Sequence, residues 1–555
     1  MLRHSHPRPP RAAALCLLAA GGLVLAPTSG VAWERPTVLS PPTVSVDGPH
    51  LAVDARGDAL LAWARGRPST EEWGLPPSSW VEAALRPSGA AGWSPAQRLS
   101  PADELALRPL PVLPPSGSGA VWWTRLQRGV LDVTGGEAVH AGGWSFRPLD
   151  METSVWTGRA ATTAPDGTLA VAEIDPWQEK PELRVRVRTP DGAWRESAPV
   201  EALDPDRLQV ALSPEGTVLV ASLEGQGEWG SPAARTRLVT VSWNPATGAW
   251  GTPERSAHMR GAGADLRLAA APDGTMVAAV VLRRGEGFAV VATSRPPGGP
   301  FGPPQVLSGN ADPDVEMAAS PMGDVFVAWN AADSPRLSVW RSENGWSRPE
   351  GAPQGVCLRP QSVVAVAAGP SGEALLVAIA GYANDWHPGM VHAWVRRPDR
   401  SWAGPVWLSR PFAGSPVAAI DGTGRMLVAW TREGRRFPVV EATSATPADA
   451  AVGAVPQDPV AVVSQPRVVS RGRARTVRFR LSRPGRVTVS VRPVGRRENA
   501  PGYDTRVVGR RGANAVPIRV RGAERIPPGR WTVTVQHNRD FIAGCPVTST
   551  PFRVR

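Results

Sequence analysis

Apolar and polar positions along the chain follow the repeat of a β-hairpin rather than the spacing of a helix. Eight times an apolar stretch meets a turn containing glycine and continues into a second apolar stretch, as in "LAVDARGDALLAW" (51–63) and "VAAIDGTGRMLVAW" (417–430). Small and β-branched residues fill both stretches, which is typical of strands buried on both faces. The pattern therefore predicts paired strands throughout residues 33–444.

The turns between these paired strands recur regularly, with their glycines 49 to 60 residues apart. Proline, aspartate and glycine in such turns supply a preset φ, a local side-chain hydrogen bond and tolerance of positive φ. The turn glycines are Gly57, Gly117, Gly167, Gly216, Gly274, Gly323, Gly372 and Gly424. Each hairpin runs on into a third strand, such as "LRVRVRT" (183–189), so we expect a repeating sheet of four antiparallel strands.

An aromatic residue followed by proline marks the fourth strand of each repeat. Seven such signatures follow hairpins, at Trp93, Trp144, Trp194, Trp250, Phe301, Trp346 and Trp402. The last hairpin ends in "FPVVEATS" (437–444) without one, whereas "WERPTVLS" (33–40) stands ahead of the first hairpin.

Sheets repeated radially leave exposed edges unless the ring closes. We therefore predict that residues 37–39 pair with 439–442, and that the fold is all-β, an eight-bladed β-propeller closed by the N-terminal strand. A seven-bladed ring is the alternative, because the second hairpin, with "PPSGSG" (114–119), is the weakest copy.

The two ends of the chain differ from the repeats. Residues 1–32 combine three arginines with an apolar run too short to span a bilayer and small residues at 30–32, which predicts a signal peptide and a secreted or cell-surface protein. Residues 445–459 are rich in alanine and proline, as in a linker. Residues 460–555 alternate with period two, which predicts a β-sandwich. Whether Cys357 and Cys545 pair stays open.

Charge divides unevenly between these parts. The chain carries +12 overall, but residues 460–555 hold 21 arginines against four acidic residues, a net +17, and residues 33–459 carry −8. A strongly basic domain attracts anionic surfaces at long range, which would allow it to bind an anionic cell-wall polymer or a membrane surface. The alternative is a spacer whose arginines reflect codon usage. We expect no nucleic-acid partner and no transmembrane segment.

In these features the repeats resemble secreted bacterial β-propellers, some of which are loosely sialidase-like. That resemblance implies the fold and says little about activity. Sialidases carry S-x-D-x-G-x-T-W boxes, and turns such as "TPDGAW" (189–194) keep the aromatic residue but not the aspartate-to-glycine spacing. "RTVRFRLSRPGRVTVSV" (475–491) is similar to the immunoglobulin-like domains that end many bacterial surface and secreted proteins, which implies a spacer or adhesive module.

Motifs for common hydrolytic, metal and phosphate chemistry are absent. G-x-S-x-G, H-E-x-x-H, paired C-x-x-C and a phosphate-binding glycine loop do not occur. "NADPDVE" (310–316) places side-chain oxygens at every second position but lacks the glycine of an EF-hand, so we expect a solvated loop. His387 and His392 are expected to be surface histidines. We predict no metal site, no cofactor and no catalytic residues.

Tryptophans outside the repeat positions supply the candidate binding site. They occur between second and third strands, each beside an acidic residue, where the topology places them on the face around the channel entrance. An aromatic ring beside a carboxylate suits a sugar. The candidates are Trp73, Trp177, Trp229 and Trp386, with Glu72, Asp175, Glu228 and Asp385 as polar partners. The alternative is that these rings anchor loops to their own blades.

Together these patterns predict an exported, non-catalytic recognition protein whose propeller face binds a carbohydrate or another extracellular partner. Two alternatives stay open, namely a sialidase-like glycoside hydrolase and a structural cell-envelope protein.

Overall fold

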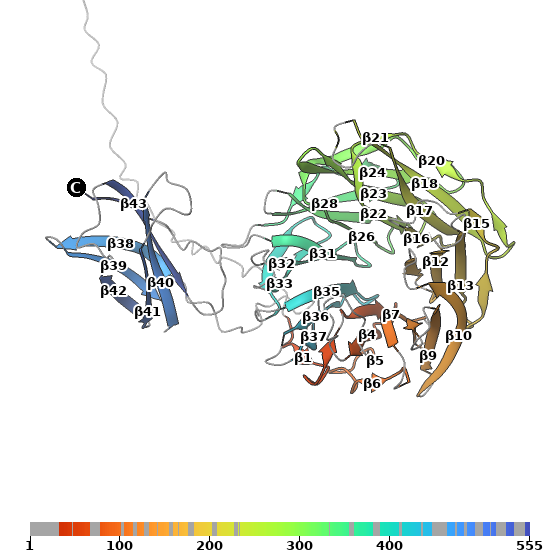
Figure 1. The fold of residues 1–555 in the computed structure, drawn as a ribbon, viewed down its shortest axis with the longest axis horizontal. Coiled ribbons are helices and arrows are strands. Elements are labelled where there is room, and N and C mark those ends of the chain that lie inside the picture. Colours follow the sequence, from red (N-terminus) through yellow and green to blue (C-terminus); the bar gives the residue numbers. More distant parts are fainter. Residues whose placement is uncertain are drawn as a thin grey trace, which may run out of the picture.

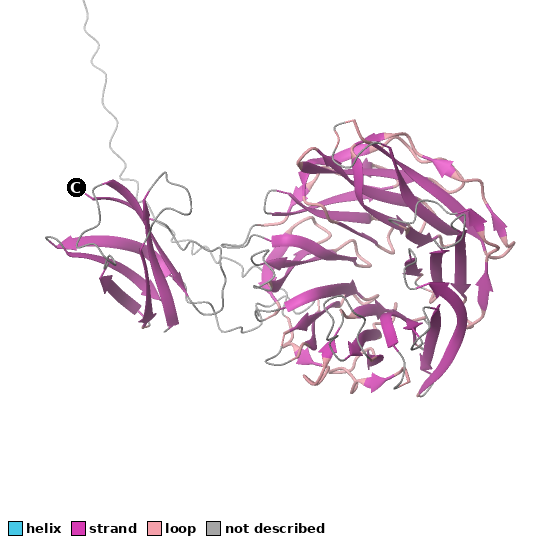
Figure 2. Ribbon diagram, in the orientation of Figure 1, coloured by secondary structure: helices cyan, strands magenta, loops and turns pink. Residues whose placement is uncertain are grey.

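The computed structural model describes most of the chain from Trp33 to Val554. Residues outside the description are 1–32, 47, 67–77, 102–104, 115–118, 127–131, 141–142, 155–158, 165, 176–181, 202–207, 227–230, 232, 332–333, 354–359, 381–388, 410–412, 434–436, 447–462, 472–473, 482–484, 494–502, 511, 518–528, 538–549 and 555. Every regular element in the described part is a β-strand (Figure 2). No helix among these residues is long and apolar enough to cross a bilayer.

Residues 33–445 form mainly antiparallel sheets in which four kinds of strand recur in chain order. A parallel pairing of Ser79 with Leu105 joins the first two sets of strands into one sheet. The first strands are β3 (His50–Val53), β7 (Leu105–Val112), β11 (Arg159–Thr163), β16 (Gln209–Leu212), β22 (Ala262–Ala270), β26 (Val315–Ala319), β31 (Pro360–Ala368) and β35 (Ala413–Ile420). The second strands are β4 (Ala59–Gly66), β8 (Ala120–Leu126), β12 (Leu169–Asp175), β17 (Val218–Gln226), β23 (Met276–Arg284), β27 (Val325–Ala331), β32 (Ala374–Ala380) and β36 (Met426–Arg432).

The third strands are β5 (Ser79–Arg86), β9 (Asp132–His140), β13 (Glu182–Arg188), β18 (Arg235–Asn244), β24 (Gly287–Arg295), β28 (Ser334–Arg341), β33 (Met390–Arg396) and β37 (Val439–Ala445). The fourth strands are β6 (Gln97–Arg98), β10 (Trp144–Ser154), β14 (Trp194–Glu196), β19 (Ala249–Trp250), β25 (Gln305–Ala311), β29 (Gly345–Trp346), β34 (Trp402–Trp407) and β1 (Thr37–Val38). Short extra strands pair alongside, namely β2 (Ser45–Val46), β15 (Val200–Glu201), β20 (Glu254–Arg255), β21 (Met259–Arg260) and β30 (Glu350–Gly351).

The sheets stand around a common centre, and their first strands lie on the inside (Figure 1). First strands of consecutive sheets contact one another, as in β16 with β22, β22 with β26 and β26 with β31. The first strand of the last sheet, β35, also contacts β3 of the first sheet. This radial order is that of a propeller-like fold, as the repeat predicts.

Glycine shapes the turn between first and second strands. The predicted turn glycines other than Gly117, which lies outside the described residues, have φ between 81° and 94°. L-residues with a side chain rarely adopt this region, which explains why the turn keeps glycine. A second glycine has a different role, since a Cβ on Gly422 would lie 2.2 Å from the carbonyl oxygen of Ala55. The turns of the first and last sheets are thus in direct contact.

The N-terminal strand pairs where the repeat pattern predicts. Strand β1 is antiparallel to β37, with Thr37 opposite Ala442 and Val38 opposite Glu441. The Leu39 amide donates to the Val440 carbonyl at 2.8 Å. The first described strand is therefore an edge strand of the sheet formed by β35, β36 and β37. Strand β37 runs to Ala445, one residue beyond the predicted end of the repeats.

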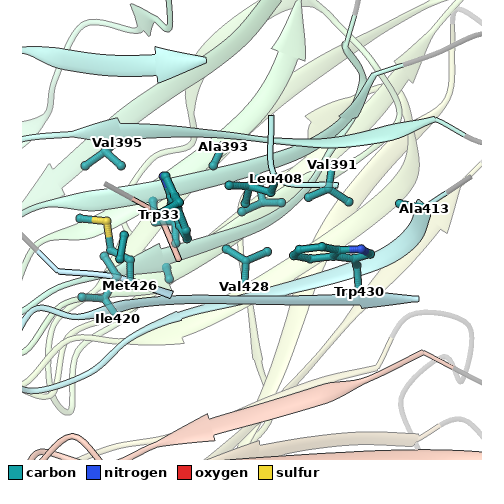
Figure 3. Close-up of a cluster of buried hydrophobic side chains, with 14 residues drawn as sticks. Trp33, Val391, Ala393, Val395, Leu408, Ala413, Ile420, Met426, Val428 and Trp430 are labelled. Atoms are coloured by element: carbon teal, nitrogen blue, oxygen red, sulfur yellow. The ribbon is translucent and has the colours of Figure 1, made fainter. Parts of the chain in front are cut away.

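Trp33 fixes this segment by packing as well as by backbone pairing. Its backbone bridges to Ala445 and its side chain is only 5% exposed. The ring lies among side chains of two neighbouring sheets, including Val391 and Val395 of β33 and Val428 of β36 (Figure 3). The signature aromatics thus fill the wedge between sheets, because large flat rings bury much apolar area.

Residues from Val463 onward form two smaller sheets. One contains β38 (Val463–Arg471), β39 (Ala474–Leu481) and β42 (Gly512–Pro517), and the other contains β41 (Tyr503–Gly509), β40 (Gly485–Pro493), β43 (Gly529–His537) and β44 (Thr550–Val554). Strand β38 contacts β43 and β44 of the other sheet. Phe479, Val491 and Trp531 are buried. The period-two pattern is thus realised as two layers of strands.

His392 corrects one expectation from the sequence. It lies on β33 and is fully buried rather than at the surface. Its ring is 5.0 Å from that of Trp407, centre to centre, in an edge-on arrangement, and neither ring nitrogen has a hydrogen-bond partner among the described residues. Burial lowers the pKa of His392 from 6.5 to about 3. Sequence spacing alone could not reveal this, since the outer strand β34 supplies the covering ring.

The first prediction concerns Trp33. Trp33→Ala should destabilise the protein by about 3–5 kcal/mol, the usual cost of emptying a buried aromatic site, and should lower the midpoint of thermal unfolding. Val38→Ala is the matched control, because Val38 lies on the same segment but is 51% exposed, and should change stability by less than about 0.5 kcal/mol. Equal midpoints for the two variants would contradict the packing role of Trp33.

The second prediction concerns acid stability. The unfolded chain protonates His392 below about pH 6.5, whereas the folded protein resists protonation until about pH 3. Stability from this group is therefore present above pH 6.5 and declines as the pH falls, by about 3 kcal/mol at pH 4. His392→Leu should lose less stability than the wild type between pH 7 and pH 4 in denaturant titrations. A parallel decline in both proteins would refute the assignment.

Candidate functional site

The first strands all begin at one end of the sheets, which we call the rim. First and second strands are antiparallel, so this is also the end at which second strands finish, as Ala262 opposite Arg283 and Arg159 opposite Glu173 show. Polar residues lie at or just before these strand starts or, like Arg267 in the middle of β22, further along the first strand. The rim residues are His50, Arg108, Arg159, Gln209, Asp265, Arg267, Asp314, Glu316 and Ser415.

Backbone irregularities recur at the rim. Strands β7, β22, β31 and β35 each shift register against their second strand near their start. Two non-glycine residues there have positive φ, Arg108 at 50° and Ser415 at 45°. Both lie nine residues before the turn glycine of their repeats, as does Asp265. Bulges re-aim side chains and are common beside binding sites, and left-handed non-glycine residues mark positions where the surroundings hold the backbone.

Three rim side chains form one ion cluster across two neighbouring sheets. The Arg267 guanidinium donates to Asp265 Oδ1 at 2.7 Å on its own strand, β22. It also reaches both oxygens of Glu316 on β26, with Nη2 to Oε1 at 3.0 Å and Nε to Oε2 at 3.5 Å. Asp265 Oδ2 accepts the Val315 amide at 3.4 Å. The cluster therefore joins adjacent first strands.

Burial and neighbouring charges set the protonation of this cluster. The side chains of Arg267, Asp265 and Glu316 are 30%, 21% and 25% exposed, so water reaches them only in part. Burial raises the pKa of Asp265 and of Glu316, while Arg267 opposes the rise in both. Burial disfavours the charged Arg267, but Glu316 and Asp265 outweigh it and the pKa of Arg267 lies above its usual value.

The ion cluster holds hydrogen-bonding groups in fixed positions at the rim. Carboxylate lone pairs beyond those used by Arg267 can accept from hydroxyl groups, and the exposed Arg108 supplies donors. Both oxygens of Glu316 are engaged by one guanidinium, which suits positioning rather than proton transfer. No group of three or more histidine, cysteine, aspartate or glutamate residues that could hold a metal ion occurs among the described residues.

The segment "NADPDVE" differs from its predicted form. Asn310 lies on β25 and Glu316 on β26, so only the middle of the run lies outside strands. Glu316 turns to Arg267, and Asp314 is exposed. A solvated loop was therefore the wrong description of Glu316, because the neighbouring sheet supplies its partner.

Almost all of the binding site predicted from the tryptophans lies outside the described residues. Trp73, Trp177, Trp229 and Trp386, together with Glu72, Glu228 and Asp385, lie outside the described residues. Asp175 ends β12, where its backbone pairs with Glu182, and its side chain is outside the description. The strand ends that lead into these segments, such as Gly66 of β4 opposite Ser79, are at the rim end of their sheets.

Sequence reasoning missed Asp265, Arg267 and Arg108. The sequence did contain a signal for the pair of Arg267 and Glu316. Both residues lie seven positions before the turn glycines of their repeats, Gly274 and Gly323. Equivalent positions in consecutive repeats become neighbours in a radial fold, so opposite charges at one repeat position predict an inter-sheet ion pair. The bulges carried no such signal.

Comparisons with known proteins give a fold-level likeness only. No family model matches the chain, and no curated protein matches it. Among solved structures, a protein of unknown function from Dyadobacter fermentans is similar at 12% identity, with a TM-score of 0.37, 75% of this chain covered and 98% of that one. The Dos1 propeller is similar at 10% identity and TM-score 0.40, covering 75% and 95%. The sialidase NanB from Streptococcus pneumoniae is similar at 10% identity and TM-score 0.35, covering 75% and 71%.

The third prediction tests the ion cluster. Arg267→Gln removes the cation between two carboxyls, so their pKa values should rise further and the variant should be about 2 kcal/mol less stable at neutral pH. Because the folded protein then holds protons that the unfolded chain releases, stability should fall as the pH rises from about 4 to about 7. The gap in unfolding midpoint between variant and wild type should therefore widen with pH.

Arg237→Gln is the matched control for this experiment. Arg237 also forms an ion pair, with Glu224, but that carboxylate is 38% exposed and Arg237 lowers its pKa. Its removal should leave the pH dependence above pH 5 unchanged. A constant gap for Arg267→Gln would show that the carboxyls at the rim do not depend on this cation.

Proposed function

We propose that this protein is an exported, non-catalytic recognition protein, an eight-bladed β-propeller followed by an immunoglobulin-like sandwich, whose rim binds a carbohydrate. The four recurring strands and the pairing of β1 with β37 support a ring closed by its N-terminal strand. The two layers of strands beyond the linker support the sandwich. The basic start, short apolar run and small residues of 1–32 support export.

The cluster of Asp265, Arg267 and Glu316 carries this proposal. It holds charged, hydrogen-bonding groups in fixed positions at the first strands of two sheets and leaves them partly exposed. Binding sites combine a few precisely placed polar groups with apolar or aromatic surface. The four tryptophans predicted from the sequence are the proposed aromatic surface, on which sugar rings would stack.

Two features favour binding over glycoside hydrolysis. A general acid must be free to deliver its proton, whereas both oxygens of Glu316 face one guanidinium. The sequence contains no sialidase box with the required spacing. The glycosidase and the purely structural alternatives nevertheless predict distinct results in the same experiment.

The fourth prediction is a binding assay with the protein lacking residues 1–32. The wild type should bind one class of polysaccharide on a glycan array and release no sugar from it. Trp73→Ala, Trp177→Ala, Trp229→Ala and Trp386→Ala combined should weaken binding at least about tenfold, as expected for losing several stacking contacts. Arg108→Gln should weaken it about threefold, the loss of one exposed polar contact.

Arg348→Gln is the control, because Arg348 is exposed but lies between β29 and β30, away from the rim. It should bind as the wild type does. Each variant's unfolding midpoint is measured alongside. Release of sugar would establish the glycosidase instead, and absence of binding to any glycan would favour the structural role.

A further inference from the structure

The outer face of the sheet β38–β39–β42 is lined by arginines. Along β39, Val477 and Phe479 are buried, while Arg478 and Arg480 are exposed. Successive side chains of a strand point to opposite faces, so the two arginines share the face turned away from the second sheet. Arg467 of β38 is also exposed. We call Arg467, Arg478 and Arg480 the arginine face.

Strand pairing places these arginines close together. Arg467 lies directly opposite Arg478. Arg478 and Arg480 are two residues apart on one strand, about 7 Å along it. On the other side of β39, exposed Ala513 and Ala515 lie opposite Arg480 and Arg478. Such small residues leave the guanidinium groups uncovered, so the face is flat and cationic.

No acidic residue balances this charge within the sheet. The sequences of β38, β39 and β42 contain neither aspartate nor glutamate. The described propeller arginines are often paired, as Arg86 is with Glu34 and Arg396 with Glu350. Like charges directly opposite each other destabilise a sheet, so Arg467 and Arg478 cost stability that a bound anion would restore.

From these contacts we infer that the arginine face binds a linear cell-wall polymer of the poly(glycerol phosphate) type. A guanidinium group matches phosphate oxygens in a two-pronged geometry. One exposed ion pair contributes little, but a polymer with a phosphate in every repeat engages several arginines at once and gains by multivalency. A row of exposed arginines on one face therefore suits a chain of charges better than a single small anion.

The described residues of this face also argue against nucleic acid as the occupant. Proteins that hold single strands stack bases on exposed aromatic rings, and the aromatic residue of this sheet, Phe479, is 3% exposed and faces the interior. Poly(glycerol phosphate) has no bases and needs no such platform. The arginine face shares no residue with the rim, so polymer binding at the face and carbohydrate binding at the rim can fail independently.

The fifth prediction uses the protein lacking residues 1–32 and poly(glycerol phosphate) as the probe, titrated by calorimetry at several salt concentrations. Arg467→Gln, Arg478→Gln and Arg480→Gln combined should weaken binding about tenfold, the loss of three exposed ion pairs. The slope of log affinity against log salt should become shallower by about 2, as expected for three lost phosphate contacts. Arg478→Gln alone should weaken binding about threefold.

Arg35→Gln, Arg260→Gln and Arg348→Gln combined are the matched control, since they remove the same charge from exposed positions in the repeat region. This control should bind as the wild type does, and the polymer should raise the unfolding midpoint of both. Equal losses in the two triple variants, unchanged binding in the first, or tighter binding of an oligonucleotide of equal charge would each overturn the inference.

Discussion

The contact between the first and last repeats is the constraint on which the rest of the fold depends. Radial sheets bury their faces against neighbours, so a gap at one place exposes two faces and a strand edge. Strand β1 covers the outer edge of β37, and Trp33 fills the wedge beside it. Arg86 adds polar contacts between the first and last repeats. Its guanidinium donates to Ser444 Oγ at 2.6 Å and to Glu34.

Arginines at the ends of other third strands form similar ion pairs with the preceding sheet. Arg295 of β24 binds Glu254 of the preceding sheet at 2.7 Å, and Arg396 of β33 binds Glu350 at 2.9 Å. These pairs join a largely buried arginine to a partly exposed carboxylate. They add little net stability, but removing the carboxylate is costly because the arginine is left without compensation. These ion pairs fix the position of adjacent sheets relative to each other. The same chemistry at the rim, in Arg267 and Glu316, leaves charge partly exposed to solvent.

Sequence predicted the parts of the fold that repeat locally. The turn glycines, the aromatic residues in the wedges and the pairing of residues 37–39 all follow from patterns that each repeat carries by itself. His392 and Glu316 were placed wrongly because a different strand or sheet decides their surroundings. The bulges at Arg108 and Ser415 were also missed, since no residue type there requires them. The ion cluster was not predicted either, because the pairing of Arg267 with Glu316 depends on which sheets become neighbours.

Pairing of the N-terminal strand with the last repeat also determines when folding can finish during synthesis. Glu34 and Thr443, joined by a 2.7 Å hydrogen bond, are 409 residues apart. Contacts that distant form late, because the intervening chain must first be made and ordered. Until the ribosome has delivered the final hairpin, the earliest strand has no partner and remains a template for wrong association. Synthesis of the last repeat thus supplies the partner of the N-terminal strand and ends the period in which that strand is most vulnerable to aggregation.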